Sequence, residues 1–177
     1  MIKKVKVDLD FDIFLMADFS MHTGTCIKHQ VHELQDIHEQ YGGFPESYTS
    51  ANTVIHQVWF DNARVDYGNI GIQLGIEPVT VSAIKQPPGC VIPLHRDTFY
   101  QTKIKYPNDS RKIVRANIFL EYSQIGHIIQ YIQSDVIHSV TEWSAGEGYM
   151  WDNEIVHLGA NAGMTPKFTL QVTGFLL

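Results

Sequence analysis

The chain is poor in cysteine, has no long hydrophobic run and carries few basic residues. Its 177 residues include two cysteines, Cys26 and Cys90, which imply no disulfide framework and fit a reducing, cytoplasmic location. No apolar run approaches the roughly 20 residues of a membrane span. The first residues also lack the apolar core of a secretion signal. We therefore expect neither a membrane segment nor an export signal.

The charge balance excludes a further class of partner. The net charge is −6, from 13 lysines and arginines against 19 aspartates and glutamates. Binding to phosphates requires clustered basic residues, so the composition argues against nucleic acid as a partner. Hydrophobic residues (44%) and charged residues (18%) occur at the levels of an ordinary globular protein. The length predicts one domain over residues 1–177.

Short β-type segments dominate the chain after residue 53. They are rich in β-branched and aromatic residues, and glycine or proline separates many of them. The predicted strands are residues 54–60, 79–85, 90–97, 112–122, 127–133, 136–143, 147–151, 155–158 and 168–176. Many short strands at this spacing predict a sandwich or barrel. We expect a mainly-β double-stranded β-helix, which is the cupin-like jelly roll.

A helical pattern precedes these strands. Apolar residues recur at helical spacing over residues 27–41, and two glycines follow. We expect this helix in an α/β lead-in (1–75), with one or two helices packed on a face of the jelly-roll core (76–177). The helix carries three histidines, His29, His32 and His38. Their order does not match the His-Glu-x-x-His motif of zinc hydrolases, so we assign them to the solvent-facing side.

Three side chains form a candidate metal site: His95, Asp97 and His157. If the segment ending at Asp97 is a strand, His95 and Asp97 share one face, because side chains alternate along a strand. A jelly roll can bring the late strand that carries His157 alongside. Two imidazoles and one carboxylate form the facial triad that binds Fe(II). Zinc accepts the same donors, so the ligand set leaves both metals open.

The order of the motifs adds to the triad. The tripeptide His95-Arg96-Asp97 comes first. It is followed by the strand Arg115-Ala116-Asn117-Ile118-Phe119-Leu120 and by the turn Trp143-Ser144-Ala145-Gly146-Glu147. His157 comes next, and Lys167 stands ten positions after it. In this order, residues 80–177 resemble the Fe(II)/2-oxoglutarate-dependent oxygenases, and among them the aspartyl/asparaginyl β-hydroxylase branch. The resemblance implies Fe(II) on His95, Asp97 and His157, with 2-oxoglutarate and O2 as co-substrates. It also implies hydroxylation of a substrate, with release of succinate and CO2.

Three positions depart from that branch. Asp97 supplies a metal carboxylate that the animal enzymes of the branch lack. Asn117 stands in place of a histidine, which weakens the inference that the substrate is an aspartyl or asparaginyl side chain. Lys167 stands in place of the usual arginine, so the charge remains but the bidentate geometry is lost.

Two strands carry the residues expected to bind the co-substrate. Lys167 and Thr169 share one face of the last strand, and a buried lysine needs an anionic partner. The resemblance supplies the outer carboxylate of 2-oxoglutarate as that partner, with the Thr169 hydroxyl as a second donor. Arg115 and Asn117 share one face of the strand over 112–122. We expect Asn117 to donate to the inner carboxylate and Arg115 to support the outer one.

The sequence leaves the substrate open between a protein or peptide side chain and a small amino acid. Tyr100, Gln101, Tyr149 and Trp151 are candidates for its pocket, although aromatic residues in strands more often belong to a core. Two other functions are compatible with a jelly roll. One is a cupin-type metalloenzyme that does not use 2-oxoglutarate, against which Lys167 argues. The other is a non-enzymatic binding module, which predicts that the three metal ligands diverge in space.

Overall fold

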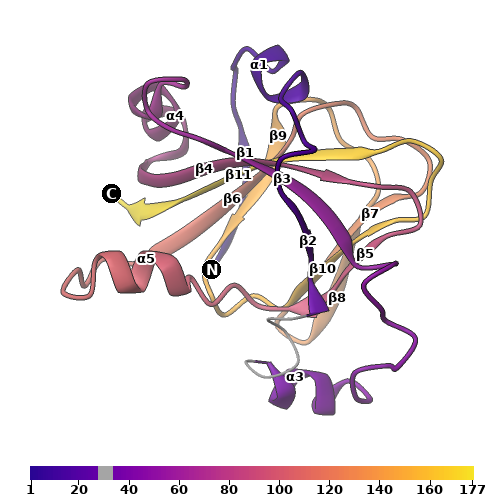
Figure 1. Ribbon diagram of the computed structural model, residues 1–177. Coiled ribbons are helices and arrows are strands. Elements are labelled where there is room, and N and C mark those ends of the chain that lie inside the picture. Colours follow the sequence, from indigo (N-terminus) through magenta and orange to yellow (C-terminus); the bar gives the residue numbers. More distant parts are fainter. Residues whose placement is uncertain (28–33) are drawn as a thin grey trace.

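The chain folds into two antiparallel sheets. The computed structural model describes residues 1–27 and 34–177. The larger sheet contains β1 (Ile2–Lys6), β2 (Thr23–Thr25), β3 (Val54–Phe60), β4 (Ile76–Gln86), β6 (Ile113–Phe119), β9 (Glu147–Trp151) and β11 (Lys167–Leu176). The smaller sheet contains β5 (Val91–His95), β7 (His127–Gln133), β8 (Val136–Val140) and β10 (His157–Asn161). Their orders are β1-β9-β6-β11-β4-β3-β2 and β5-β10-β7-β8 (Figure 1). The predicted mainly-β jelly roll is confirmed.

Short helices flank the sheets. They are α1 (Asp12–Leu15), α3 (Gln35–Gln40), α4 (Tyr67–Leu74) and α5 (Tyr100–Lys105). The helix predicted over residues 27–41 is seen as α3, whereas His29 and His32 lie outside the described residues. The sequence did not predict α4, although Asp66 caps its start and Gly75 ends it with a φ of 72°. No helix in the described part of the chain is long and apolar enough to cross a membrane.

His38 was assigned to the solvent-facing side of its helix, and this prediction is wrong. The side chain is buried, and its Nε2 lies 2.9 Å from the carbonyl oxygen of Leu94. The ring also packs on Phe44, with 4.8 Å between ring centroids. An imidazole combines an apolar body with polar nitrogens, so it can be buried where one nitrogen meets a carbonyl. The contact fixes α3 against β5, one residue before His95.

The main hydrophobic core lies on the outer face of the larger sheet. This face presents apolar side chains from the strands, which pack on α1 and α4. Its members include Val81, Ala83, Leu170 and Val172 from the sheet, and Phe14, Ile70 and Leu74 from the lead-in. The lead-in also supplies β1, β2 and β3 to the sheet. Because side chains alternate along a strand, the opposite face is free to carry polar residues toward the smaller sheet.

Two strand boundaries differ from the prediction near the metal ligands. Strand β5 ends at His95, so Asp97 lies beyond the strand rather than on one of its faces. Strand β10 begins at His157 rather than at residue 155, because a turn precedes it. In this turn the Ile155 N–H donates to the Asp152 carbonyl at 3.4 Å. The bounds of β3, β7 and β9 are those predicted.

We expect Gly148→Ala to destabilise the protein by about 1–3 kcal/mol, because it overpacks the contact between β9 and β6. A Cβ at this position would lie 2.2 Å from the Asn117 carbonyl oxygen and 2.8 Å from Ile118 Cα. Gly24→Ala is the control, since a Cβ there meets nothing within 4 Å. Urea unfolding of both variants measures the difference. Equal midpoints would contradict the close packing of these strands.

Candidate active site

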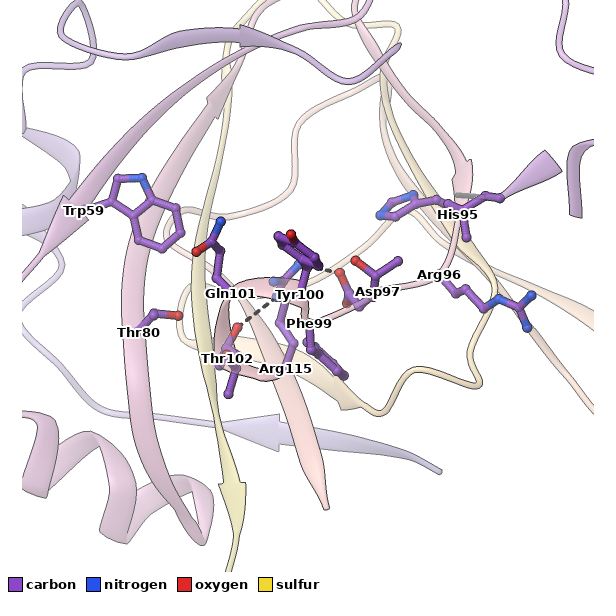
Figure 2. Close-up of a pocket in the computed structure, with 13 residues that line it drawn as sticks. Trp59, Thr80, His95, Arg96, Asp97, Phe99, Tyr100, Gln101, Thr102 and Arg115 are labelled. Carbon is purple, nitrogen blue, oxygen red and sulfur yellow. Dashed lines mark hydrogen bonds and ion pairs between the residues drawn. The ribbon is translucent and has the colours of Figure 1, made fainter. Parts of the chain in front are cut away.

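Two cavities meet at the predicted metal ligands. The outer cavity has a volume of about 330 Å³ and is bordered by His95, Asp97 and Arg115 (Figure 2). The inner cavity is narrower, at about 60 Å³, and is bordered by His95, His157 and Lys167. His95 therefore belongs to both walls. A binding site for a small molecule typically measures about 300–1,000 Å³. The volume of the outer cavity lies within this range, and that of the inner cavity lies below it.

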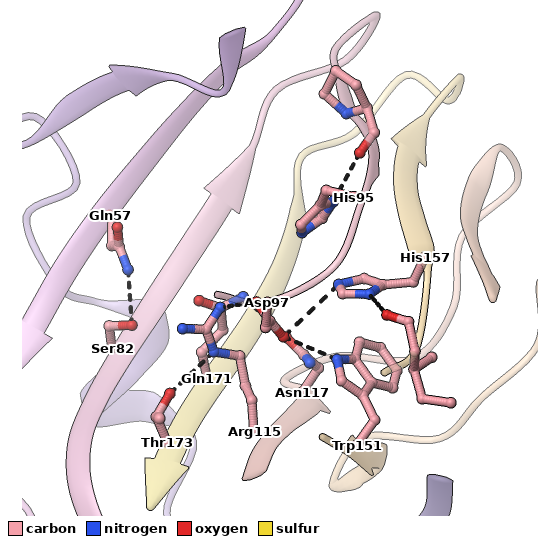
Figure 3. A network of polar contacts seen from close by, with 12 residues as sticks. Gln57, Ser82, His95, Asp97, Arg115, Asn117, Trp151, His157, Gln171 and Thr173 are labelled. Atoms are coloured by element: carbon pink, nitrogen blue, oxygen red, sulfur yellow. Dashed lines mark hydrogen bonds and ion pairs between the residues drawn. The ribbon is translucent and has the colours of Figure 1, made fainter. Parts of the chain in front are cut away.

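His95, Asp97 and His157 converge between the cavities. One ligand atom from each lies within 4.8 Å of the others. The two histidines are cross-strand partners on β5 and β10, which places their rings 4.2 Å apart. Asp97 Oδ2 lies 4.0 Å from His157 Nε2 (Figure 3). The structure thus brings together the three residues that the sequence predicts as ligands, but Asp97 lies in the segment after the strand and not on a face of it.

Backbone carbonyls orient both imidazoles. His95 Nδ1 lies 2.8 Å from the Pro93 carbonyl, and His157 Nδ1 lies 3.0 Å from the Ile155 carbonyl. A carbonyl only accepts, so each Nδ1 carries the proton and each Nε2 keeps its lone pair. Burial lowers the pKa of His157 to about 3 and also lowers the pKa of His95. Both rings are therefore neutral at pH 7, as a metal ligand must be.

Two donors hold the Asp97 carboxylate. Arg115 Nη1 forms an ion pair with Oδ1, and Trp151 Nε1 donates to Oδ2 at 3.0 Å (Figure 3). Burial is the largest single effect and opposes ionisation of Asp97. The Arg115 charge, the neighbouring histidines and the Trp151 hydrogen bond together outweigh it, so the pKa of Asp97 lies below its usual value. The carboxylate is therefore ionised and fixed without any metal. Sequence reasoning placed Trp151 only as a possible pocket wall; no motif signals its bond to Asp97.

Lys167 borders the inner cavity. Its side chain is buried, at 4% exposure, and its Nζ donates to the carbonyls of Ile128 and Ala160, each at 3.0 Å. No carboxylate pairs with it among the residues described. Burial lowers the pKa of Lys167 to about 7. An ammonium group in this position gains stability from an incoming anion.

Polar side chains line the rest of the inner cavity. Thr169 and Gln171 follow Lys167 on the same face of β11, as predicted, and Asn117 faces them from β6. Gln171 Nε2 donates to Asn117 Oδ1 at 3.0 Å. Within the described residues, the buried Asn117 Nδ2 and Gln86 Oε1 have no hydrogen-bond partner. A buried polar atom without a hydrogen-bond partner lowers the stability of the folded protein. These two atoms would therefore gain from a polar ligand in the cavity.

Arg115 lies apart from the predicted co-substrate residues. It was expected to support the outer carboxylate with Lys167, but it borders the outer cavity, where its Nε donates to Thr173 at 3.0 Å. Arg115 and Asn117 are two residues apart on β6, which separates them by about 7 Å along the strand. They therefore reach different sides of the triad. Of the four predicted residues, Lys167, Thr169 and Asn117 share one cavity.

The candidate pocket residues are divided between the outer cavity and the core. Tyr100 and Gln101, at the start of α5, border the outer cavity (Figure 2). Tyr149 packs against the smaller core cluster of Phe119, Ile129, Trp143, Trp151 and Ile155 between the sheets. Phe99, the residue before Tyr100, has a φ of 53°, a left-handed conformation that non-glycine residues rarely adopt. This bend turns the chain from the metal ligand Asp97 into α5.

The donor set fits a divalent transition metal. Two neutral imidazoles and one ionised carboxylate converge at short range, and the partners of the three ligands orient them in advance. This combination is that of the facial triad for Fe(II), and zinc sites use it too. The three protein ligands leave coordination positions for other molecules. The chemistry of the donors therefore supports a catalytic rather than a closed structural metal site.

The fold is shared with known oxygenases. No family model and no curated protein matches the sequence. A prolyl-4-hydroxylase from Pseudomonas putida matches with a TM-score of 0.58 and 18% identity, over 99% of this chain and 92% of that one. The non-heme alpha-ketoglutarate-dependent epimerase SnoN matches with a TM-score of 0.58 and 11% identity, over 97% and 76%. The related carbocyclase SnoK has the same TM-score at 10% identity, over 98% and 79%. At these identities the likeness establishes the jelly-roll fold.

We expect Trp151→Phe to weaken divalent-metal binding by about 10–100-fold, the usual effect of removing a group that orients a metal ligand. The change keeps the ring but removes the N–H that donates to Asp97. Trp143→Phe is the matched control, because this buried indole donates instead to the Glu121 carbonyl. Calorimetric titration with Zn(II) measures both variants. Equal affinities would show that the indole does not position Asp97.

Proposed function

We propose that the protein is an Fe(II)- and 2-oxoglutarate-dependent dioxygenase that hydroxylates an organic substrate. The observation that carries this proposal is the inner cavity, which is bordered by two of the three metal ligands, His95 and His157, and by the buried Lys167, which has no carboxylate partner among the residues described. A dicarboxylate has one anionic group for the metal and a second for Lys167, and the inner cavity, at about 60 Å³, is far smaller than the outer one. The jelly-roll fold of the structural neighbours is consistent with this reaction. The aspartyl/asparaginyl hydroxylase branch stays a prediction from the motifs.

Each residue has a separate task in this proposal. His95, Asp97 and His157 would hold the iron, which when bound supplies the activation of O2. Lys167 and Thr169 would bind the outer carboxylate of 2-oxoglutarate through charge-assisted hydrogen bonds. Asn117 would donate its free N–H to the inner carboxylate. Arg115 acts through Asp97 rather than on the co-substrate, because its guanidinium holds that carboxylate.

The inner cavity also controls water. It lies between the two sheets, and Gln171 Nε2 is bonded to Asn117 Oδ1, whereas Asn117 Nδ2 and Gln86 Oε1 are free to meet a ligand. A bound dicarboxylate would fill it and exclude solvent from one side of the metal, which strengthens electrostatic interactions there. Substrate would then approach from the outer cavity, the larger space beside the triad. Cupin-type enzymes without 2-oxoglutarate do not require the buried lysine, so that alternative leaves Lys167 without a role.

The free cysteines bear on the cellular location, and the proposed reaction defines the binding partners. Both cysteines are free thiols, which agrees with a reducing cytosol, and we retain the cytoplasmic location as part of the proposal. The partners are 2-oxoglutarate, O2 and a substrate that can be a peptide or protein side chain or a small amino acid.

We expect the Fe(II)-loaded protein to convert 2-oxoglutarate to succinate in the presence of ascorbate and O2. Lys167→Ala should raise the Michaelis constant for 2-oxoglutarate about 10–100-fold, since it removes a charged hydrogen-bond partner. Succinate formation, followed by mass spectrometry with varied substrates, measures both.

Lys85→Ala is the matched control for this variant. Lys85 precedes Gln86 on β4, but its Nζ lies 6.0 Å from the Phe168 ring, outside the inner cavity. An unchanged Michaelis constant in Lys167→Ala would overturn the assignment of that lysine. Absence of iron-dependent turnover by the wild-type protein, across the substrates tried, would overturn the proposed reaction.

We expect 2-oxoglutarate binding to weaken as the pH rises. The pKa of Lys167 is lowered to about 7, so the free protein carries the binding charge below pH 7 and loses it above. Affinity should fall by about tenfold between pH 6 and pH 8, because binding above the pKa requires uptake of a proton. Calorimetry on the Zn(II)-loaded protein measures this. Lys167→Arg keeps its charge throughout and should remove the dependence; a slope retained in this variant would assign the titration to another group.

A further inference from the structure

The outer cavity has the properties of a second binding site. It borders the metal ligands His95 and Asp97, whereas Lys167, Thr169 and Asn117, which the proposed function assigns to 2-oxoglutarate, do not line it. Its volume of about 330 Å³ is at the lower end of the range for small-molecule sites. The site therefore suits a small molecule or a single side chain better than the body of a folded protein.

The charged residues that line this cavity each have a partner, but Arg115 keeps one donor group free. Arg96 pairs with Asp36 at 2.7 Å, and Asp97 is held by Arg115 and Trp151. Arg115 uses Nη1 for Asp97 and Nε for Thr173, while Nη2 donates to no acceptor among the residues described. A divalent metal at the triad would add further positive charge. The cavity thus favours an anion and disfavours an ammonium group.

Two exposed aromatic rings border the same cavity. Trp59 lies within β3 and is 51% exposed, whereas its neighbours Val58 and Phe60 are buried. Tyr100 is 59% exposed at the start of α5. Figure 2 shows Trp59 across the cavity from Asp97, with Gln101 and Tyr100 between them. An aromatic ring gains free energy when another apolar or aromatic group covers it, so these rings offer a surface for the apolar part of a ligand.

We propose that the outer cavity binds a substrate that carries a carboxylate and an aromatic or similarly planar apolar group. The carboxylate takes the free Nη2 of Arg115, and the planar group packs against Trp59. This inference rests on the proposed function, because the metal and 2-oxoglutarate define which cavity remains for substrate. Because Nη1 and Nε are already used, Nη2 offers one charge-assisted hydrogen bond to a carboxylate oxygen.

Binding of three matched probes tests the inference. These are 3-phenylpropionate, its amide 3-phenylpropanamide, and 2-phenylethylammonium, titrated into Zn(II)-loaded protein with saturating 2-oxoglutarate. We expect the carboxylate to bind at least about tenfold more tightly than the amide, as a charge-assisted hydrogen bond allows, and the ammonium to bind most weakly. Equal binding of the amide or the ammonium would overturn the proposal.

Variants locate the bound probe. Trp59→Ala should weaken the carboxylate and the amide by the same factor, about tenfold, and leave their ratio unchanged. Tyr122→Ala, which removes an aromatic ring of 67% exposure outside the cavity, should change neither affinity. Unchanged binding in Trp59→Ala would exclude the ring as a contact. Arg115→Gln should abolish the preference for the carboxylate, with bound zinc measured in parallel because Arg115 also holds Asp97.

Two further measurements distinguish a failure of this inference from a failure of the proposed function. A carboxylate probe could enter the inner cavity, so its affinity is also measured in Lys167→Ala without 2-oxoglutarate. Lost affinity there would place the probe on Lys167 and overturn the substrate site. If the wild-type protein binds no 2-oxoglutarate, the proposed function fails, and the ratio of carboxylate to amide on the Zn(II)-loaded protein still decides the chemistry of the outer cavity.

Discussion

The site depends on one buried ion pair, between Asp97 and Arg115. A carboxylate withdrawn from water loses several kcal/mol of solvation unless charged or polar donors replace it. Arg115 supplies the opposite charge and Trp151 a hydrogen bond, so both oxygens of Asp97 have partners. These donors come from β6 and β9, two adjacent strands of the larger sheet, whereas the histidines come from the smaller sheet. The ion pair therefore joins the two sheets at the metal ligands.

The inner face of the larger sheet accepts polar residues because stability comes from elsewhere. Lys167, Thr169 and Gln171 face the cavity, while Leu170 and Val172, between and beside them, belong to the outer core. The apolar face is covered by α1 and α4 of the lead-in, whose Phe14, Ile70 and Leu74 belong to the core. The lead-in also borders the outer cavity through Trp59.

Local pattern explains what the sequence could predict. Alternation of side chains correctly placed Lys167 with Thr169, and β-branched runs located most strands, because both depend on neighbours in the chain. Asp97 shows the limit: it was assigned to a strand, but its position follows from the bend at Phe99 and from donors 18 and 54 residues away. The solvent-facing assignment of His38 failed for the same reason, since the Leu94 carbonyl that accepts it lies 56 residues further on. The helix α4 was missed although its capping residues, Asp66 and Gly75, are visible in the sequence.

The separation of the apolar core from the polar face has an evolutionary consequence. A substitution on the inner face that leaves the Asp97–Arg115 pair intact alters which molecule is bound without opening a hole in the outer core. Proteins built this way can exchange substrates while the fold persists. The outer core thus permits chemical diversification of the face that it does not touch.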